Sequence, residues 1–207
     1  MAQIFDELGN GVILRGTPVD IDKDDRQPHL TREQSYELLK RALNKYKFAL
    51  GTSPGRLVIH KSSNFTETEL DGFREATTEV KVSTTDFVTI LDTDMRLFRD
   101  GIYPPYRGIH VEFDENTNLL YTRGSVKYYM TYPGSYIPQP IEIRIVDSDE
   151  SPEIICQEIL GLTKMNWNNT RFDGKYPITI QCARYVGQIM KYLDEHEQPQ
   201  IRYSFYM

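Results

Sequence analysis

The stretch RLVIHKSSNFTETEL, residues 56–70, constrains the fold more than any other part of the chain. Its continuous apolar run, Leu57–Ile59, is typical of a strand that is buried on both faces of an α/β sheet. Thr66 and Glu69 then form a capping box, which predicts that a helix starts there. A lysine and two serines, residues 61–63, lie between the strand and the helix. Because open α/β sheets bind ligands at the carboxyl ends of their strands, this turn is a candidate site.

The rest of the sequence alternates between helix and strand patterns. Two short apolar strands around Gly9-Asn10-Gly11 predict a hairpin near the amino terminus. Capping residues and apolar spacing predict further helices and strands. In chain order these are a helix from Thr31 to about Leu50, a strand at Asp86–Asp92, a strand at Pro140–Val146, a helix from Ser151 to about Leu162 and a helix from about Pro177 to Leu193. Since the sequence has no internal repeat or low-complexity linker, we expect residues 1–207 to form one α/β domain.

The composition excludes several classes of protein. With 39% hydrophobic and 26% charged residues, the chain has the composition of a globular protein. No apolar run approaches the ~18 residues of a membrane-spanning helix, and the amino terminus does not have the pattern of a signal peptide. We therefore expect a cytoplasmic protein without a membrane partner. A formal charge of −6 argues against nucleic-acid binding through overall basicity, but it allows a local basic groove.

The cysteines and histidines show no metal-binding or nucleophile pattern. Cys156 and Cys182 lie in helical segments without a Cys-x-x-Cys or Cys/His partner, so we expect both to be small core residues. His60 lies in the predicted strand and is interpreted as a ring that is satisfied within the fold, not as a general base.

Four segments, in the same order, resemble the carboxyl-terminal part of the PIWI domain of Argonaute proteins, and the prokaryotic members most closely. They are SPGRLVIHKSSNFTETELDGF, GSVKYYMTYPGSYIPQPIEIRIV, EILGLTKMNWNNTRFDGKYPITIQCARYVGQIM and the terminal RYSFYM. The resemblance implies an RNase H-like fold, in which helices flank a mixed sheet. It also implies that the chain lacks the first strand of the full domain and the MID domain before it. Met1 would then start a fragment or a separately encoded piece.

The resemblance further implies that the nuclease site of this domain is lost. Active Argonautes resemble other nucleases that hold two divalent metal ions on carboxylates. In those members the strand equivalent to Arg56–Ile59 ends in Arg-Asp-Gly, and Ser62 stands where that Asp would be. In those members a second metal ligand follows an alanine early in the helix that this chain starts near Pro177, and here Cys182-Ala183 is followed by Arg184. We therefore expect no catalytic residue, no catalytic metal and no cleavage of the target.

Hydrogen-bond donors gather where the helix that ends near Leu162 passes into the following loop. Such side chains commonly contact phosphate and sugar oxygens, and in Argonautes the equivalent region lines the channel of the guide strand. The predicted nucleic-acid-binding residues are Lys61, Ser62, Lys164, Asn166, Asn168, Asn169, Thr170, Arg171, Gln181 and Arg184. The alternative for Lys61 and Ser62 is a polar turn without a ligand. Trp167 is interpreted as a core residue or a support for the loop.

The predicted function is guide-directed binding of a complementary target through contacts with the nucleic-acid backbone. The implied partners are a guide strand and its target, either RNA or DNA, together with the missing MID domain and an effector protein. In the family the terminal carboxylate, here on Met207, lies near the 5′ end of the guide. This negatively charged carboxylate would need a positively charged partner there, which would be a metal ion, such as Mg²⁺ at the guide 5′ phosphate, or a basic residue of the MID domain. The alternative is a terminal edge strand without a ligand role.

Two other functions stay open. A metal-dependent nuclease could use carboxylates such as Asp6, Asp22 or Asp92 in place of the lost ligands. The run Asp92-Thr93-Asp94, however, has too few ligands for a calcium loop and is interpreted as the cap of a turn. A structural module would instead bind an effector protein through the Tyr-rich middle section, and it would have no affinity for nucleic acid.

Overall fold

The computed structural model describes residues 2–5, 11–14, 27–129, 137–165, 174–190 and 192. The strands in these ranges are β1 (Ala2–Phe5), β2 (Gly11–Leu14), β3 (Arg56–Lys61), β4 (Thr84–Asp92), β5 (His110–Glu112), β6 (Thr117–Leu120) and β7 (Ile141–Asp147). The helices are α1 (Arg32–Leu50), α2 (Glu67–Val80), α3 (Pro152–Leu162), α4 (Ile178–Met190) and a short 3₁₀ helix, η1 (Lys127–Tyr129).

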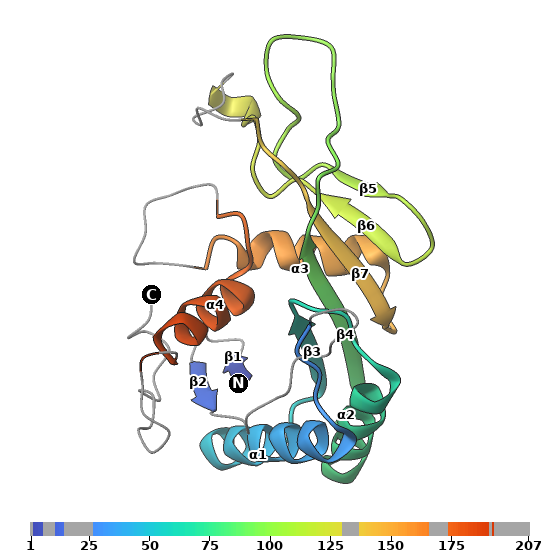
Figure 1. Cartoon of the computed structure of the whole chain (residues 1–207), viewed down its shortest axis with the longest axis vertical. Helices are drawn as coiled ribbons and strands as arrows, with labels where there is room; N and C mark the ends of the chain where they lie inside the picture. Colours follow the sequence, from blue (N-terminus) through green and yellow to red (C-terminus); the bar gives the residue numbers. More distant parts are fainter. Residues whose placement is uncertain are drawn as a thin grey trace.

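The described strands form two sheets (Figure 1). β1 and β2 pair as the antiparallel hairpin that the sequence predicts. The second sheet has the order β3-β4-β7-β6-β5, in which β3 and β4 are parallel and the other neighbours are antiparallel. A mixed sheet flanked by helices confirms the predicted fold class.

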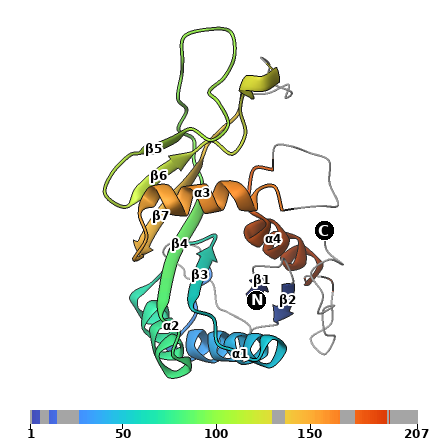
Figure 2. The ribbon, with the colours of Figure 1, turned by 180° about the vertical axis from the view of Figure 1, so that it is seen from behind.

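Two apolar cores lie on opposite faces of the five-stranded sheet, and β4 contributes to both. Successive side chains of a strand point to opposite faces. Phe87 packs with residues of α1 and α2, whereas Val88 and Ile90 pack with residues of α3 and α4. Figure 2 shows α3 crossing the strands and α4 beside the β1–β2 hairpin. The buried Cys156 and Cys182 confirm the interpretation of both as small core residues.

The helix starts follow the local sequence. The Thr31 hydroxyl accepts from the Gln34 N–H, while the Gln34 side chain accepts from the Thr31 N–H, so both groups of the predicted capping box are satisfied. The box of Thr66 and Glu69 closes in the same way at the start of α2. Ser151 caps α3, whose first residue is a proline. The predicted helix starts are therefore set by local hydrogen bonds.

A glycine brings α1 and α2 into close contact. A Cβ atom at Gly72 would lie 2.2 Å from the carbonyl oxygen of Arg32 and 2.9 Å from the Cβ atom of Ser35. These distances are shorter than a carbon atom tolerates, so only glycine fits at this crossing. The close crossing fixes α2, and with it the strand exit that precedes α2.

The position of β3 corrects one prediction. Its continuous apolar run predicts a strand buried on both faces, but β3 is an edge strand of the described sheet and all six of its residues are half-buried. Val58 packs against the core with α3, and Leu57 and Ile59 pack against the core with α1 and α2. Two-sided packing therefore explains the apolar run, while the absence of a second neighbouring strand in the described residues explains the exposure.

Among the described residues, no helix is both long enough and apolar enough to cross a membrane.

Candidate nucleic-acid interface

The parallel strands β3 and β4 end at the same edge of the sheet, and the first turn of α4 meets them there. β4 continues beyond the pairing of Lys61 with Thr89 and ends at Asp92. The Nδ1 atom of His60 lies 2.9 Å from the hydroxyl oxygen of Thr179 in α4, which joins the end of β3 to that helix. The carboxyl ends of β3 and β4 and the first turn of α4, called here the strand edge, thus form the part of the fold where α/β sheets bind ligands.

At this edge three donors converge on the carboxylate of Asp92. The Lys175 ammonium group and the Tyr176 hydroxyl both donate to Oδ1. A guanidinium nitrogen of Arg184 lies 3.4 Å from Oδ2. The Arg184 guanidinium also stacks on the Tyr176 ring, with 3.8 Å between its central carbon and the ring centre. Two cations and one phenol are therefore held together by a single carboxylate.

The pKa of Asp92 reflects this arrangement. Partial burial opposes ionisation, but hydrogen bonds from Lys175 and Tyr176 and the positive charge of Arg184 hold the pKa below its ordinary value. Asp92 is consequently ionised at neutral pH. Lys175, Arg184 and Asp92 together carry one net positive charge at an edge of an otherwise acidic chain.

The loop that carries Lys175 is anchored beside the end of α3. Thr122 donates its hydroxyl to the Lys175 carbonyl oxygen at 2.6 Å. A Cβ atom at Gly174 would lie 2.6 Å from the carbonyl oxygen of Thr163, so the backbones touch at this glycine. Lys164 follows Thr163 and is exposed. A third cation is therefore close in the fold to the loop that carries Lys175.

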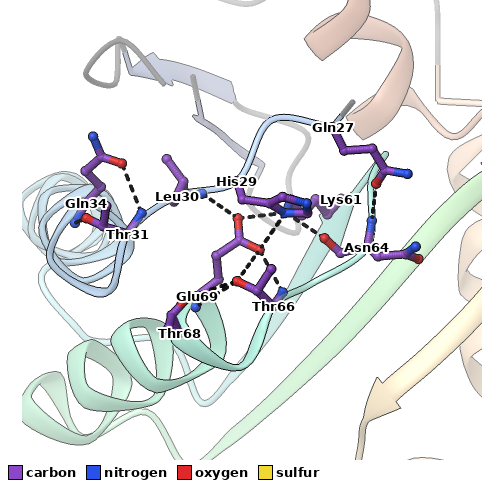
Figure 3. Close-up of polar contacts among 10 residues, drawn as sticks. All are labelled: Gln27, His29, Leu30, Thr31, Gln34, Lys61, Asn64, Thr66, Thr68 and Glu69. Carbon is purple, nitrogen blue, oxygen red and sulfur yellow. Dashed lines mark hydrogen bonds and ion pairs between the residues drawn. The ribbon is translucent and has the colours of Figure 1, made fainter. Parts of the chain in front are cut away.

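The ammonium group of Lys61 points back toward the start of α2 (Figure 3). It donates to both carboxylate oxygens of Glu69 at 2.7 Å and to the Asn64 carbonyl oxygen at 2.8 Å. These three acceptors match the three protons of the group. The contacts favour the alternative of a structural turn, although Lys61 as a nucleic-acid contact stays a prediction.

Glu69 organises the turn from inside the protein. Its side chain is fully buried and accepts from the N–H groups of Leu30 and Thr66 as well as from Lys61. Burial alone would raise its pKa, but these hydrogen bonds and the charge of Lys61 lower it below its ordinary value. The capping-box glutamate thus also binds the lysine of the strand exit.

The predicted site residues fall into three groups. Arg184 lies at the strand edge, and Gln181 lies one turn before it on α4, where its amide is 3.4 Å from the Tyr185 hydroxyl. Lys61, Ser62 and Lys164 lie at the ends of β3 and α3. Six other residues lie outside the described residues: Asn166, Asn168, Asn169, Thr170, Arg171 and Met207. Trp167 also lies outside them.

The carboxylates of the nuclease alternative do not gather in the described part of the chain. Asp6 and Asp22 lie outside it. Asp92 lies at the edge, but it is bound by cations. Among the residues that the structure describes, no three His, Cys, Asp or Glu side chains are grouped closely enough to hold a metal ion.

Two features of this edge were missed by sequence reasoning. Lys175 and Tyr176 were not predicted as site residues, although they directly precede the Pro177 that starts the α4 region. The run Asp92-Thr93-Asp94 was interpreted as the cap of a turn, and the role of Asp92 as a partner of cations was not predicted. Thr93 makes that cap, since its hydroxyl accepts from the Met95 N–H at 3.3 Å, while Asp92 binds Lys175 and Arg184.

His60 fits its interpretation as a satisfied strand residue. Its ring hydrogen-bonds to Thr179, and burial lowers its pKa to about 4 against the opposing effect of Asp86. A neutral ring is expected at physiological pH.

The middle of the chain exposes several large apolar side chains. Residues 93–109 and 121–129, called here the middle lobe, extend away from the sheet in Figure 1. Phe98, Ile102 and Tyr128 are each 87–88% exposed, and the Arg99 guanidinium lies 4.1 Å from the centre of the Tyr106 ring. Apolar side chains exposed together mark candidate interaction surfaces.

Comparison with solved structures identifies the fold. The Argonaute of Clostridium butyricum, bound to a guide DNA and a 19-mer target DNA, matches 90% of this chain with a TM-score of 0.65 and 17% identity. The Aquifex aeolicus Argonaute matches 84% with a TM-score of 0.59 and 20% identity, and the same protein with externally bound siRNA gives 0.60 and 19%. No model of a known protein family matches the sequence, and no curated protein matches it.

The chain therefore has the RNase H-like fold of the PIWI part of Argonaute, which confirms the predicted resemblance at the level of fold. It spans 23–24% of the length of these Argonaute chains. At identities of 17–20% the match establishes the fold, while function depends on the site residues themselves.

Proposed function

We propose that this chain is the carboxyl-terminal part of the PIWI domain of a cleavage-deficient prokaryotic Argonaute, which holds a guide strand and its complementary target. Base pairing between guide and target would supply the sequence specificity, while the protein binds the backbone. A MID domain would bind the guide 5′ end, with Mg²⁺ or a basic residue between the phosphate and the Met207 carboxylate.

The cations at the strand edge are the observation that carries this proposal. Lys164 follows the end of α3, Lys175 lies in the loop before α4, and Arg184 lies in α4. Lys175 and Arg184 contact Asp92 at the end of β4, although the whole chain has a formal charge of −6. The matched Clostridium butyricum structure contains guide and target DNA, and its fold is the same. A local basic edge on such a fold fits a phosphate backbone, because Lys and Arg displace the counterions of phosphates.

The absence of cleavage is proposed from two positions. Ser62 stands where the resemblance implies a metal-binding aspartate, and a serine hydroxyl supplies no negative charge. Arg184 stands where it implies a second ligand, and its guanidinium lies against Asp92 and would repel a divalent cation. These two substitutions support binding without hydrolysis over the alternative of a metal-dependent nuclease.

Guide binding can be tested by its salt dependence in the full-length protein that contains this chain. Replacing both Lys164 and Arg171 with Ala should weaken binding about equally for every guide sequence, because phosphate contacts carry no base information. The slope of log affinity against log salt should fall by roughly one to two units, at about 0.7–0.9 per lost contact.

A matched control removes the same charge elsewhere. Lys45 and Lys47 are exposed on α1, away from the strand edge, so their double replacement with Ala should leave the slope nearly unchanged. Equal slopes for both double variants would mean that the groove lies elsewhere.

The middle lobe favours a second candidate function, which is the binding of an effector protein. It combines exposed aromatic and aliphatic side chains with five Lys and Arg against two Asp, a composition typical of protein interfaces. This candidate predicts that replacing Phe98 and Ile102 with Ser abolishes effector binding. As the sole function it also predicts no affinity for nucleic acid, so guide binding by the full-length protein would exclude it.

A further inference from the structure

The Asp92 cluster has the composition of an anion-binding site. A lysine ammonium, a tyrosine hydroxyl and an arginine guanidinium all point their donors at one pair of oxygens. These groups are also the side chains that bind phosphate oxygens in proteins. A phosphodiester offers the same ligand as Asp92, two oxygens that share one negative charge.

The donors are held in place independently of Asp92. The backbone of Lys175 is fixed by the hydrogen bond from Thr122, and the Lys175 side chain is only 19% exposed. Arg184 belongs to a helix and stacks on Tyr176. A donor set that is already ordered loses little entropy when its ligand changes.

The side chain of Asp92, in contrast, is placed so that it can turn away from the three donors. It is the last residue of β4, and its side chain is 53% exposed. Its own charge is balanced by two cations in a setting open to solvent, where ion pairs contribute only modestly to stability.

We propose that Lys175, Tyr176 and Arg184 form a backbone-phosphate site that Asp92 fills in the free protein and that a phosphate of the bound strand takes over. The inference rests on the proposed function, because the strand supplies the phosphate. It assigns binding roles to Lys175 and Tyr176 and makes Asp92 a competing internal ligand. Asp92 thereby weakens binding of nucleic acid and offsets part of the positive charge of the two cations until a strand arrives.

Removal of the competing charge should strengthen binding. Asp92→Asn should raise the affinity of the full-length protein for a guide strand about three- to tenfold, since the strand no longer displaces an ion pair. Asp94→Asn changes the net charge equally at an exposed position two residues further on, so it should leave the affinity within about a factor of two. Lys175→Met should lower the affinity and reduce the salt slope by about one unit.

The experiment measures fluorescence anisotropy of a labelled single-stranded guide over a range of salt for these three variants and the wild type. Thermal unfolding of each variant checks that it is folded. Tighter binding by Asp92→Asn than by Asp94→Asn supports the inference. Affinity of Asp92→Asn equal to or below that of Asp94→Asn overturns it, while salt-dependent binding by the wild type would leave the proposed function standing.

A second probe separates the two ideas if no variant binds the guide. That result would contradict the proposed function, and inorganic pyrophosphate measured by calorimetry would then decide the inference alone. Tighter pyrophosphate binding by Asp92→Asn than by Asp94→Asn would support an anion site behind Asp92. Equal binding, or none, would overturn it.

Discussion

Replacement of Lys61 with Met tests whether the strand exit is built for structure or for ligand binding. The Lys61 side chain is 18% exposed, and that of its partner Glu69 is fully buried. Removing one partner of a buried ion pair costs about 3–5 kcal/mol, because the other charge is left without compensation. Glu69 keeps the N–H groups of Leu30 and Thr66, so we expect the lower end of this range, about 3 kcal/mol.

The free energy of unfolding is measured by urea titration with linear extrapolation. Arg32→Met is the control, because the Arg32–Glu75 ion pair at 2.9 Å is exposed on both sides and should be worth less than ~1 kcal/mol. Adding Glu69→Gln to Lys61→Met should recover part of the loss, since the uncompensated charge is removed.

The pH dependence gives an independent check. The folded pKa of Glu69 is lowered in the wild type, so its contribution is present at neutral pH and is lost as the pH falls through that folded pKa. Without Lys61, burial should raise the pKa of Glu69. The cost of Lys61→Met should therefore be full at neutral pH, shrink as the pH falls through the raised pKa of Glu69 in the variant, and be lost below the lowered folded pKa of Glu69 in the wild type.

Two results would refute this reasoning. One is a loss for Lys61→Met no larger than that for Arg32→Met. The other is a fall in the salt slope of guide binding in a normally folded Lys61→Met protein, which would make Lys61 a phosphate contact.

Three further predictions concern the fold. Gly72→Ala should destabilise the protein by about 1–3 kcal/mol because its methyl group meets the Arg32 carbonyl, whereas Gly161→Ala, with open space around it, should be neutral or stabilising in urea titration. Ile143→Ala should cost about 2–5 kcal/mol at a fully buried position and clearly more than Ile59→Ala on the half-buried edge strand; equal losses would contradict the sheet order. Because the folded pKa of His60 is about 4, stability should fall as the pH drops from 6.5 toward 4, and His60→Gln should remove that part of the pH dependence seen by thermal unfolding.

Local signals predicted the elements well because their hydrogen bonds are local. The capping boxes of Thr31 and Thr66 each satisfy the backbone within three residues, so sequence spacing is sufficient to place them. The apolar run of β3 showed that both faces are packed, but an apolar run carries no information about how many strands lie beside it.

The site was harder to predict because its contacts span long stretches of chain. Asp92 meets Lys175 and Arg184 across more than eighty residues, and spacing cannot show such a meeting. The sequence showed Lys61 at the strand exit and Glu69 in the capping box. It did not show that Glu69 also binds Lys61, because that contact depends on the burial of Glu69 in the folded chain. Arg184 was found through the family resemblance and its place on the helix next to the donor-rich loop, and the fold places it beside Asp92.

The most direct test of the account uses the full-length protein loaded with a guide strand in the presence of Mn²⁺. A labelled target that matches the guide is followed on one native gel for binding and on one denaturing gel for length. We predict that the matched target is retained and stays intact, and that a target with an unrelated sequence is not retained. Cleavage of the target at one position, or equal retention of matched and unrelated targets, would contradict guide-directed binding without cleavage.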